Sequence, residues 1–393
     1  MTHLNPALPS LEGRLLRLLR DEGPRTRSEL ARALGVSRTT VSGEVAALAG
    51  AGLVTPGPVA PSSGGRRSST VGLGPAVRMA AVSVAESRVR ATVLDATFAI
   101  SRPVTRDRTG GESPEELCRL VVETVSQAMS QAAVDSSGHH AVLATGLALA
   151  PGLLVQPDEL VAGIEAATGG APVVHEQAAR AMAIGERHSG GARGLDDVVV
   201  LRLGATVSTA TFMDGHLGRG SAALAGAIGH TRVDEFGPAC AGCGSSGCLD
   251  SFVSVSAVTE QAAAAARSGR SPGLARSLAA GEEIGWAEVV AAVGGGDPVA
   301  VQIARDMGRR VGETIAGLVA FANPSIVLVG GPGAALGPHL LNEVRSAMYR
   351  RAPAHVVAGT QVELGAPGDR AALLGAGLLA AEIALGDGSL RNR

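Results

Sequence analysis

The apolar positions near the start of the chain recur at helical spacing and predict three short helices. The first, over residues 11–21, is indicated by a stripe that one helical face would bury: Leu11, Leu15, Leu18 and Leu19. Thr26 and Glu29 have the spacing of a capping box, which predicts that a second helix begins just after Thr26. Ser37 is of a type that favours the position before a helix, and it predicts the start of the third.

The small and apolar residues of this region predict a helix-turn-helix unit. Ala31 is small enough to let two helices approach closely, and Gly35 permits the left-handed turn that would end the second helix. Val41, Val45 and Leu48 would form the buried stripe of the third helix, which packs back on the second. Two helices joined by such a turn form the helix-turn-helix motif.

A wing and a basic segment are predicted after the third helix. Residues 52–59 have the pattern of a short β-hairpin, and Arg66 and Arg67 follow on a Gly-rich segment that suits a narrow minor groove. Winged helices place the N-terminal end of the third helix in the major groove. We therefore predict a winged helix-turn-helix DNA-binding domain over residues 1–72, with these further candidate contacts: Ser37, Arg38, Thr39, Thr40 and Ser42.

Alternatives stay open for this domain. Arg38 is suited both to reading a guanine edge and to gripping a phosphate. Gly43 lowers the helix propensity of the third helix, and Glu44 would repel a phosphate if it faced the groove. A three-helix protein-interaction domain would show the same helical pattern, so it remains the alternative to DNA binding.

The remainder of the chain alternates short apolar runs with longer amphipathic stretches. Residues 82–94 have the alternation of two strands joined by a hairpin. Further buried strands are predicted over residues 141–150, 198–203 and 325–329, and helices over residues 115–133, 299–322 and 371–385. This mixture predicts an α/β fold.

Composition adds a charge asymmetry to this picture. The 393 residues are 46% hydrophobic and 18% charged, which suits a soluble globular protein of two or three domains. Residues 1–72 hold nine Arg against five Asp or Glu, a net charge of +4, which leaves −6 on the other residues for the overall −2. A basic front on an acidic body is typical of a DNA-reading module joined to a separate domain.

The chain is expected to be cytoplasmic and to have no membrane partner. Residues 1–10 show no basic start followed by an apolar core, so no signal peptide is predicted. The longest apolar stretches are interrupted by Pro, Gly or charge, which argues against a membrane span.

A cluster of metal-ligating residues lies in the second half of the chain. His230, Cys240, Cys243 and Cys248 supply one imidazole and three thiols, a complete tetrahedral set for Zn²⁺. Four protein ligands leave no open position, so we predict a structural zinc rather than a catalytic one. Reduced cysteines that bind zinc also fit the cytoplasm. Free thiols in a Gly-rich loop, or a disulfide, are the alternatives.

This cluster resembles the signature of the ROK proteins, a group of bacterial sugar kinases and sugar-responsive repressors. The resemblance covers Gly229-His230-x9-Cys240-x2-Cys243-Gly244-x2-Gly247-Cys248-Leu249-Asp250, with one extra residue between the first two cysteines and Asp250 in place of Glu. Residues 9–70 are similar to the MarR-like winged helices of ROK repressors. The resemblance implies a two-lobed actin-like ATPase (ROK/hexokinase-like) fold over residues 76–386, followed by a polar tail over residues 387–393.

The same resemblance implies that kinase chemistry has been lost. Ser83 stands where the phosphate-binding hairpin of a ROK kinase has Asp, and Ala85 and Glu86 replace its glycines. Ala178 stands where the catalytic-base Asp belongs, and a methyl group cannot accept a proton. A sugar-contacting Glu is replaced by Ala227. We therefore predict that the chain is not an enzyme.

The hypothesis from the sequence is a sequence-specific transcriptional regulator, a repressor rather than an activator. It would bind a double-stranded DNA operator as a homo-oligomer, a dimer or tetramer, with structural Zn²⁺ and with the identity of any small-molecule effector left open. A sugar kinase with a fused DNA-binding head is one alternative. A zinc-stabilised DNA-binding protein that senses no ligand is the other.

Overall fold

The computed structural model describes residues 10–59, 69–100, 102–134, 141–153, 157–281 and 283–386. Arg66, Arg67 and the predicted tail over residues 387–393 lie outside these ranges. Internal contacts divide the chain into two compact units. Unit 1 comprises Met1–Ala148, Leu154–Glu176 and Ala376–Arg393, and unit 2 comprises Leu149–Leu153 and Gln177–Gly375. Each unit is described by itself.

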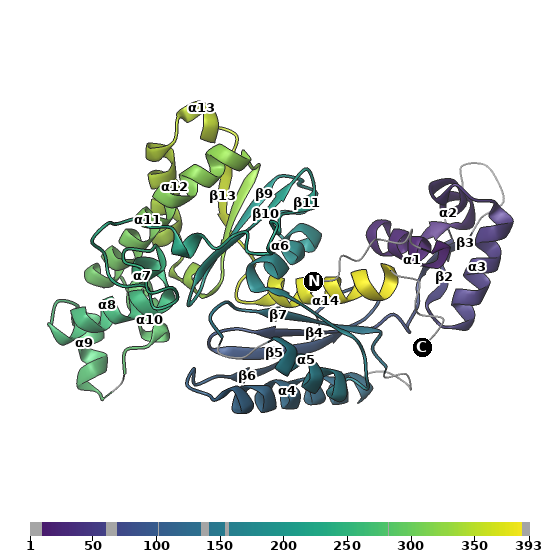
Figure 1. The fold of residues 1–393 in the computed structure, drawn as a ribbon, viewed down its shortest axis with the longest axis horizontal. Coiled ribbons are helices and arrows are strands. Elements are labelled where there is room, and N and C mark those ends of the chain that lie inside the picture. The colour runs from purple at the N-terminus through teal and green to yellow at the C-terminus, as the bar shows by residue number, and fades with distance from the viewer. Residues whose placement is uncertain are drawn as a thin grey trace. The chain divides into compact units, whose positions relative to one another are not determined.

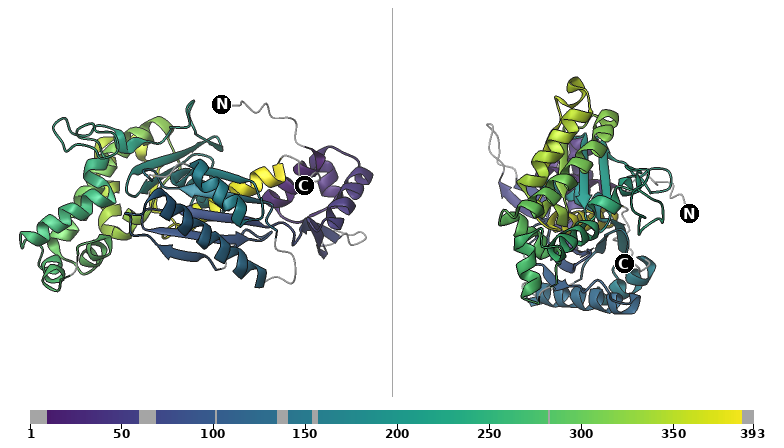
Figure 2. Two further views of the ribbon diagram at one scale, coloured as in Figure 1. Left: turned by 60° about the horizontal axis from the view of Figure 1, so that its bottom comes forward. Right: turned by 90° about the vertical axis from the view of Figure 1, so that its left-hand side faces the viewer.

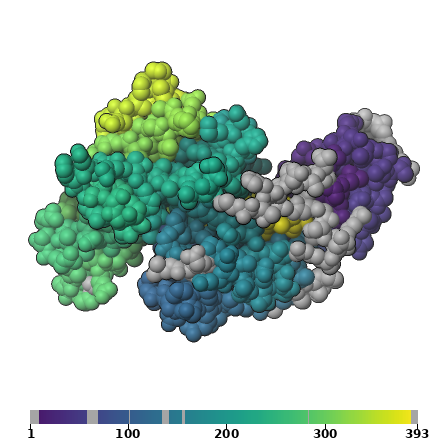
Figure 3. Space-filling view, in the orientation of Figure 1, coloured from purple at the N-terminus to yellow at the C-terminus, as the bar shows by residue number. Residues whose placement is uncertain are grey.

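The three predicted N-terminal helices are present in unit 1. They are α1 (Leu11–Glu22), α2 (Arg27–Leu34) and α3 (Arg38–Gly50), and their side chains pack into one body, drawn in purple in Figure 3. The predicted capping box is confirmed, because the Thr26 hydroxyl accepts a hydrogen bond from the Glu29 amide while the Glu29 carboxylate accepts one from the Thr26 amide. Gly35 ends α2 in the left-handed region, at φ 67°.

The hairpin predicted within residues 52–59 is wrong in its bounds, because these residues supply only one strand of the wing. Strand β2 (Val54–Val59) pairs antiparallel with β3 (Ser69–Leu73), and β3 also pairs with β1 (Arg25–Thr26). The three-stranded sheet therefore has the order β1-β3-β2 and ties the wing to the turn between α1 and α2. The two-residue strand β1 was not predicted.

Unit 1 also contains a five-stranded sheet. Its order is β6-β5-β4-β7-β8, from β4 (Met79–Val84), β5 (Arg88–Leu94), β6 (Val104–Asp107), β7 (Ala144–Leu149) and β8 (Val173–Gln177). Helices α4 (Pro114–Val134) and α5 (Pro157–Ala167) lie side by side on one face (Figures 1 and 2). The C-terminal part of α14 (Arg370–Gly386) covers the other face, where Gly146 lets β7 approach the backbone of Ala376.

Unit 2 is built on a second five-stranded sheet with the order β11-β10-β9-β12-β13. Its strands are β9 (Val198–Leu203), β10 (Val207–Met213), β11 (His216–Leu217), β12 (Ile326–Gly330) and β13 (Gln361–Leu364). Strand β12 pairs in parallel with β9 and β13, whereas β10 pairs antiparallel with β9 and β11. The mixed α/β prediction is therefore confirmed in both units.

Helices pack against this sheet and supply most of the residues of the hydrophobic core that they share with it. Helix α6 (Ala178–Ser189) contacts β9 and β10, and residues of β9 and β12 share a buried core with α11 (Pro298–Ala322) and α12 (Pro338–Arg351). The shorter helices are η1 (Ile228–His230), α7 (Asp250–Val253), α8 (Val255–Arg267), α9 (Pro272–Ala279), α10 (Trp286–Gly294), η2 (Pro332–Leu336) and α13 (Ala354–Val357). Within the described ranges, no helix is both long and apolar enough to cross a bilayer.

Candidate DNA-binding surface and metal site

The N-terminal end of α3 is ordered by a serine cap. The Ser37 hydroxyl accepts a hydrogen bond from the Thr40 amide at 3.0 Å, and the two side-chain hydroxyl oxygens lie 2.8 Å apart. This cap satisfies an amide that the helix itself leaves unpaired. The hydroxyls of Ser37 and Thr40 therefore stabilise the N-terminal end of α3, in addition to any contact they make with DNA.

The remaining candidate residues of α3 lie on its solvent side. Arg38 and Thr39 are exposed and Ser42 is half-buried, while the predicted core stripe of Val41, Val45 and Leu48 is at most 3% exposed. Within the described part of the chain, neither Arg38 nor Thr39 makes a side-chain hydrogen bond. The first turn of α3 thus presents a free cation and a free hydroxyl next to the positive end of the helix dipole.

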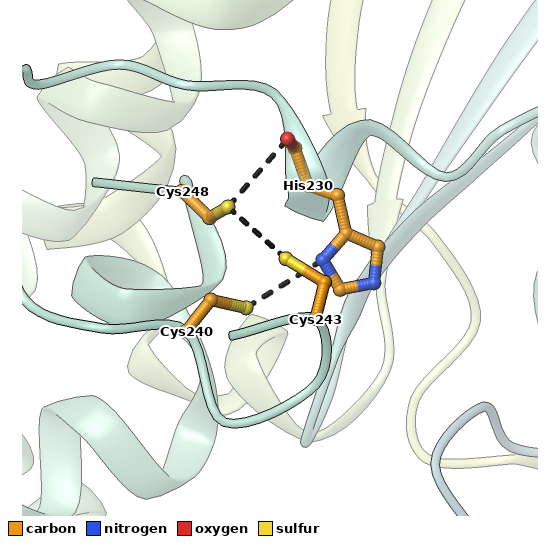
Figure 4. Close-up of side chains that lie close together, drawn as sticks. All are labelled: His230, Cys240, Cys243 and Cys248. Carbon is orange, nitrogen blue, oxygen red and sulfur yellow. Dashed lines mark hydrogen bonds between the residues drawn. The ribbon is translucent and has the colours of Figure 1, made fainter. Parts of the chain in front are cut away.

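The four predicted metal ligands meet in one place in unit 2 (Figure 4). His230 ends η1, and the three cysteines lie on the loop that leads into α7. The ligand atoms all lie within 4.8 Å of one another. The Cys240 sulfur is 3.5 Å from His230 Nδ1, and the sulfurs of Cys243 and Cys248 are 3.6 Å apart.

These distances can be compared with the requirements of a tetrahedral zinc ion. Zn–S bonds of about 2.3 Å and a Zn–N bond of about 2.0 Å place neighbouring ligand atoms about 3.5–3.8 Å apart. The two measured separations agree with this spacing. A disulfide would instead bring two sulfurs to about 2.0 Å, and the three thiols of the loop are free. The donor set and its spacing therefore fit a metal ion.

The backbone of the loop holds the thiols in position independently of an ion. The Gly244 amide donates to the Cys240 carbonyl at 2.8 Å, and the Cys240 amide donates to the Ser245 carbonyl at 2.8 Å. Gly247 has φ 73°, and a side chain there would collide with the carbonyl of Asp234. Glycine is therefore required at this position, because any side chain would clash.

The thiols differ in their affinity for protons. Hydrogen bonds from Ser245 lower the pKa of the exposed Cys243 thiol to about 6. Burial, together with hydrogen bonds to the neighbouring thiols, raises the pKa of Cys248 to about 12. The loop can therefore hold one thiolate near neutral pH, whereas the buried thiol would ionise only beside a cation.

Asp250 connects the metal loop to the sheet. Its carboxylate accepts a hydrogen bond of 2.7 Å from the Val207 amide at the start of β10, and Gly229 lies directly against it. Burial raises the pKa of this carboxyl group. The residue that replaces the Glu of the ROK signature is thus engaged with the β9–β10 turn.

The residues predicted to replace the phosphate-binding hairpin lie in unit 1, at the end of β4 and in the turn to β5. Ser83 is 2% exposed. The Arg108 guanidinium donates to the Ala85 carbonyl at 2.7 Å and pairs with Glu112 at 3.2 Å. The turn is therefore held by the chain's own arginine, which the sequence analysis did not identify.

The residue predicted to replace the catalytic base lies in unit 2, where α6 begins. Ala178 is its first residue and is 3% exposed. Arg180, two residues later, is 6% exposed and donates to the carbonyls of Ala223 and Ala225 at 3.1 and 3.2 Å. The sequence analysis did not identify this buried arginine, because its loop partners lie more than 40 residues away in the sequence.

Comparison with known proteins supplies a family context for these features. Residues 79–383 match the ROK family, and residues 8–68 match the MarR family. A putative xylose repressor of Caldicellulosiruptor sp. is 29% identical over 228 residues, which cover 58% of this chain but only 56% of that protein. A glucokinase of Streptomyces coelicolor is 29% identical over 285 residues, covering 66% of this chain and 87% of the enzyme.

A solved structure extends the likeness in fold to nearly the whole chain. The crystal structure of a ROK family transcriptional regulator, described as a homolog of the E. coli MLC protein, superposes with a TM-score of 0.76. It covers 97% of both chains at 22% identity. Such a likeness establishes that a winged helix followed by the ROK fold is a shared architecture.

Proposed function

The chain belongs to the ROK family, and we propose that it is a DNA-binding transcriptional regulator, a repressor, rather than a sugar kinase. The observation that carries the proposal is the winged helix, whose α3 turns an uncommitted Arg38 and Thr39 to solvent. The MarR match over residues 8–68 and the likeness to a putative xylose repressor support it.

In this proposal the first turn of α3 enters the major groove of an operator. Arg38, Thr39 and Ser42 would contact base edges or phosphates, and the Ser37 cap, with Thr40, would orient the helix end toward a phosphate. Arg66 and Arg67 would reach the minor groove. A homo-oligomer would place paired winged helices on two half-sites of a pseudo-palindrome.

The loss of kinase chemistry is the second part of the proposal. Ala178 offers no atom that can take a proton from a sugar hydroxyl, and the Ala85 carbonyl in the hairpin turn is occupied by Arg108. The likeness to a glucokinase keeps sugar phosphorylation as the second candidate function. ATP turnover by the purified chain with hexoses and amino sugars would establish that candidate.

The third part is that the metal is a structural Zn²⁺ held by His230, Cys240, Cys243 and Cys248. The ion would close the loop between η1 and α7 and leave no coordination position for substrate. Thiols that must stay reduced to bind it suit the cytoplasm. A protein that relied on zinc alone and sensed no ligand is the alternative, and a thermal shift by a bound small molecule would rule it out.

The test of the main proposal is the selection of bound fragments from genomic DNA by the zinc-loaded protein, followed by footprinting. We expect a reproducible inverted repeat. Arg38→Ala should lose the footprint, whereas the matched variant Arg119→Ala, an exposed arginine of α4, should keep it. Retention of DNA without any sequence preference would contradict a specific regulator.

A further inference from the structure

A cavity of about 800 Å³ lies within unit 1, and it is lined by residues of both the winged helix and the part of the chain that forms the five-stranded sheet and α4. Its walls come from the turn after α3, the end of β3, the β5–β6 loop and α4. Pockets of roughly 300–1,000 Å³ are typical of small-molecule sites. We propose that this cavity is an effector site, and that it takes a small organic anion that carries hydroxyl groups.

The charges of the lining favour an anion. Arg78 and Arg102 both line the cavity, against the single carboxylate of Asp95. Arg102 is exposed, and among the described residues it has no hydrogen bond or ion pair. Asp95 accepts two hydrogen bonds from Thr97, at 2.8 Å to the amide and 2.6 Å to the hydroxyl. Arg78 also donates to the Ala132 carbonyl at 3.2 Å. Two guanidinium groups against one carboxylate leave the wall with a net charge of +1.

The other lining groups favour a ligand that is both small and hydroxylated. Thr92 and Gln131 offer a hydroxyl and an amide that hydrogen-bond equally well to hydroxyl groups. The lining also includes Ala96, Ala99 and Ala128, whose methyl groups suit the carbon chain of a compact molecule. Hydroxy acids and the phosphate esters of polyols share this chemistry.

Backbone hydrogen bonds join the two walls, so a ligand in the cavity would contact both the winged helix and the five-stranded sheet of unit 1. The Gly74 amide donates to the Leu53 carbonyl at 2.8 Å, and the Ala76 amide donates to the Gly52 carbonyl at 3.1 Å. A side chain at Gly74 would collide with the Gly52 carbonyl, so this junction is tightly packed. Gly52 itself lines the cavity two residues after the end of α3.

A second connection joins the winged helix to α14. Glu382 of α14 forms ion pairs with Arg17 and Arg20 of α1, at 3.6 and 2.7 Å. A ligand that fits only one placement of the winged helix would shift the population toward that placement. Resting on the proposed function, the site would therefore change the affinity for the operator.

The test of the site uses calorimetry on the full zinc-loaded chain without DNA. Two anions are each compared with a neutral counterpart: glycerol 3-phosphate with glycerol, and D-gluconate with sorbitol. We expect one anion of the two to bind while its counterpart does not, which also separates phosphates from carboxylates. Arg102→Gln should weaken binding by about tenfold or more, since a charged hydrogen bond is lost. Arg119→Gln, outside the cavity, should bind like the parent.

The outcomes separate the site from the proposed function. Failure of both anions, equal binding of the neutral compounds, or equal losses in the two variants would overturn the site. Gln131→Trp, which fills the cavity from α4, should abolish binding and gives a second variant if Arg102→Gln does not fold. If the anion binds but operator affinity is unchanged, the site stands and the coupling is wrong. If no operator is selected, the proposed function fails while calorimetry still decides the site.

Discussion

At the scale of single residues, the metal loop combines thiols whose pKa values are shifted in opposite directions. Cys243 is exposed and has its pKa lowered to about 6, whereas Cys248 is buried and has its pKa raised to about 12. Burial opposes the ionisation of the Cys248 thiol and raises its pKa. A divalent cation would remove that restriction, because it stabilises each thiolate directly. The stability of the loop should therefore depend on the ion.

Cys243→Ser should lower the zinc content of the purified protein and destabilise unit 2. We expect the free energy of unfolding to fall by about 2–4 kcal/mol, since loss of a metal is among the substitutions with large effects. Metal analysis and denaturant unfolding measure the two quantities. Cys118→Ser is the matched control, because Cys118 lies on α4, outside the cluster. Equal zinc content in both variants would remove Cys243 from the ligand set.

Glu112 gives the chain a stability term that depends on pH. Burial opposes its ionisation, but hydrogen bonds from its own amide and that of Thr109, with the charge of Arg108, lower its pKa from 4.5 to about 2. Since the folded pKa lies below the ordinary value, this stabilisation is complete above about pH 4.5 and is lost as the pH falls toward 2.

Glu112→Gln should remove that term. We expect the variant to be less stable than the parent at neutral pH, and the difference in thermal midpoint to shrink as the pH falls toward about 2. Melting curves of the two proteins across this range provide the measurement. Glu123→Gln, which changes an exposed carboxylate of α4, is the control for loss of a surface carboxylate. A difference that stays constant with pH would contradict the low pKa of Glu112.

At the scale of elements, α3 contains a glycine that the fold does not require. Gly43 is exposed, and a methyl group added there would meet no atom within 4 Å. Glycine in a helix interior costs about 0.5–1 kcal/mol relative to alanine. Gly35, by contrast, has φ 67°, a conformation that alanine adopts only with strain.

Gly43→Ala should therefore stabilise α3 by about 0.5–1 kcal/mol, and Gly35→Ala should destabilise the turn by about 1 kcal/mol. Hydrogen exchange of the α3 amides measures the local opening free energy in each variant. Unchanged or reduced protection in Gly43→Ala would contradict this prediction. Operator affinity measured on the same variants tests separately whether DNA approaches this position.

The elements also show how far the sequence could be read. Helix limits followed from local signals such as the Thr26–Glu29 box, and those signals act within one turn of the helix. The two residues of β1 are too few to show any period, and their pairing with β3 depends on contacts more than 40 residues away. Arg108 and Arg180 follow the same logic, because burial of a charged side chain depends on which carbonyls the tertiary fold brings to it.

The candidate sites divide in the same way. The four metal ligands could be found from spacing alone, since three of them share one short loop. The cavity beside the winged helix could not, because its walls combine segments from residue 49 to residue 132. Residue types such as Arg102 and Gln131 give no signal of a shared wall until the sheet and α4 bring them together.

At the scale of the whole molecule, charge is divided between a basic front and an acidic remainder. Residues 1–72 carry +4 and the other residues −6. Binding to a polyanion must therefore depend on a few cations concentrated in the winged helix, because the rest of the chain repels DNA. The salt dependence of binding reports how many of these cations contact phosphates. Each phosphate contact contributes about −0.9 to the slope of log K against the logarithm of the salt concentration.

Arg38 can be assigned to a phosphate or to a base from this slope. If it contacts a phosphate, Arg38→Ala should reduce the slope by about 1 and weaken binding to all sequences alike. If it reads a guanine, the variant should tolerate other bases at one operator position and lose about 1–3 kcal/mol on the specific site. Arg119→Ala controls for the change in net charge. Affinity, slope and specificity that all match the parent would remove Arg38 from the DNA interface and favour a protein partner for α3.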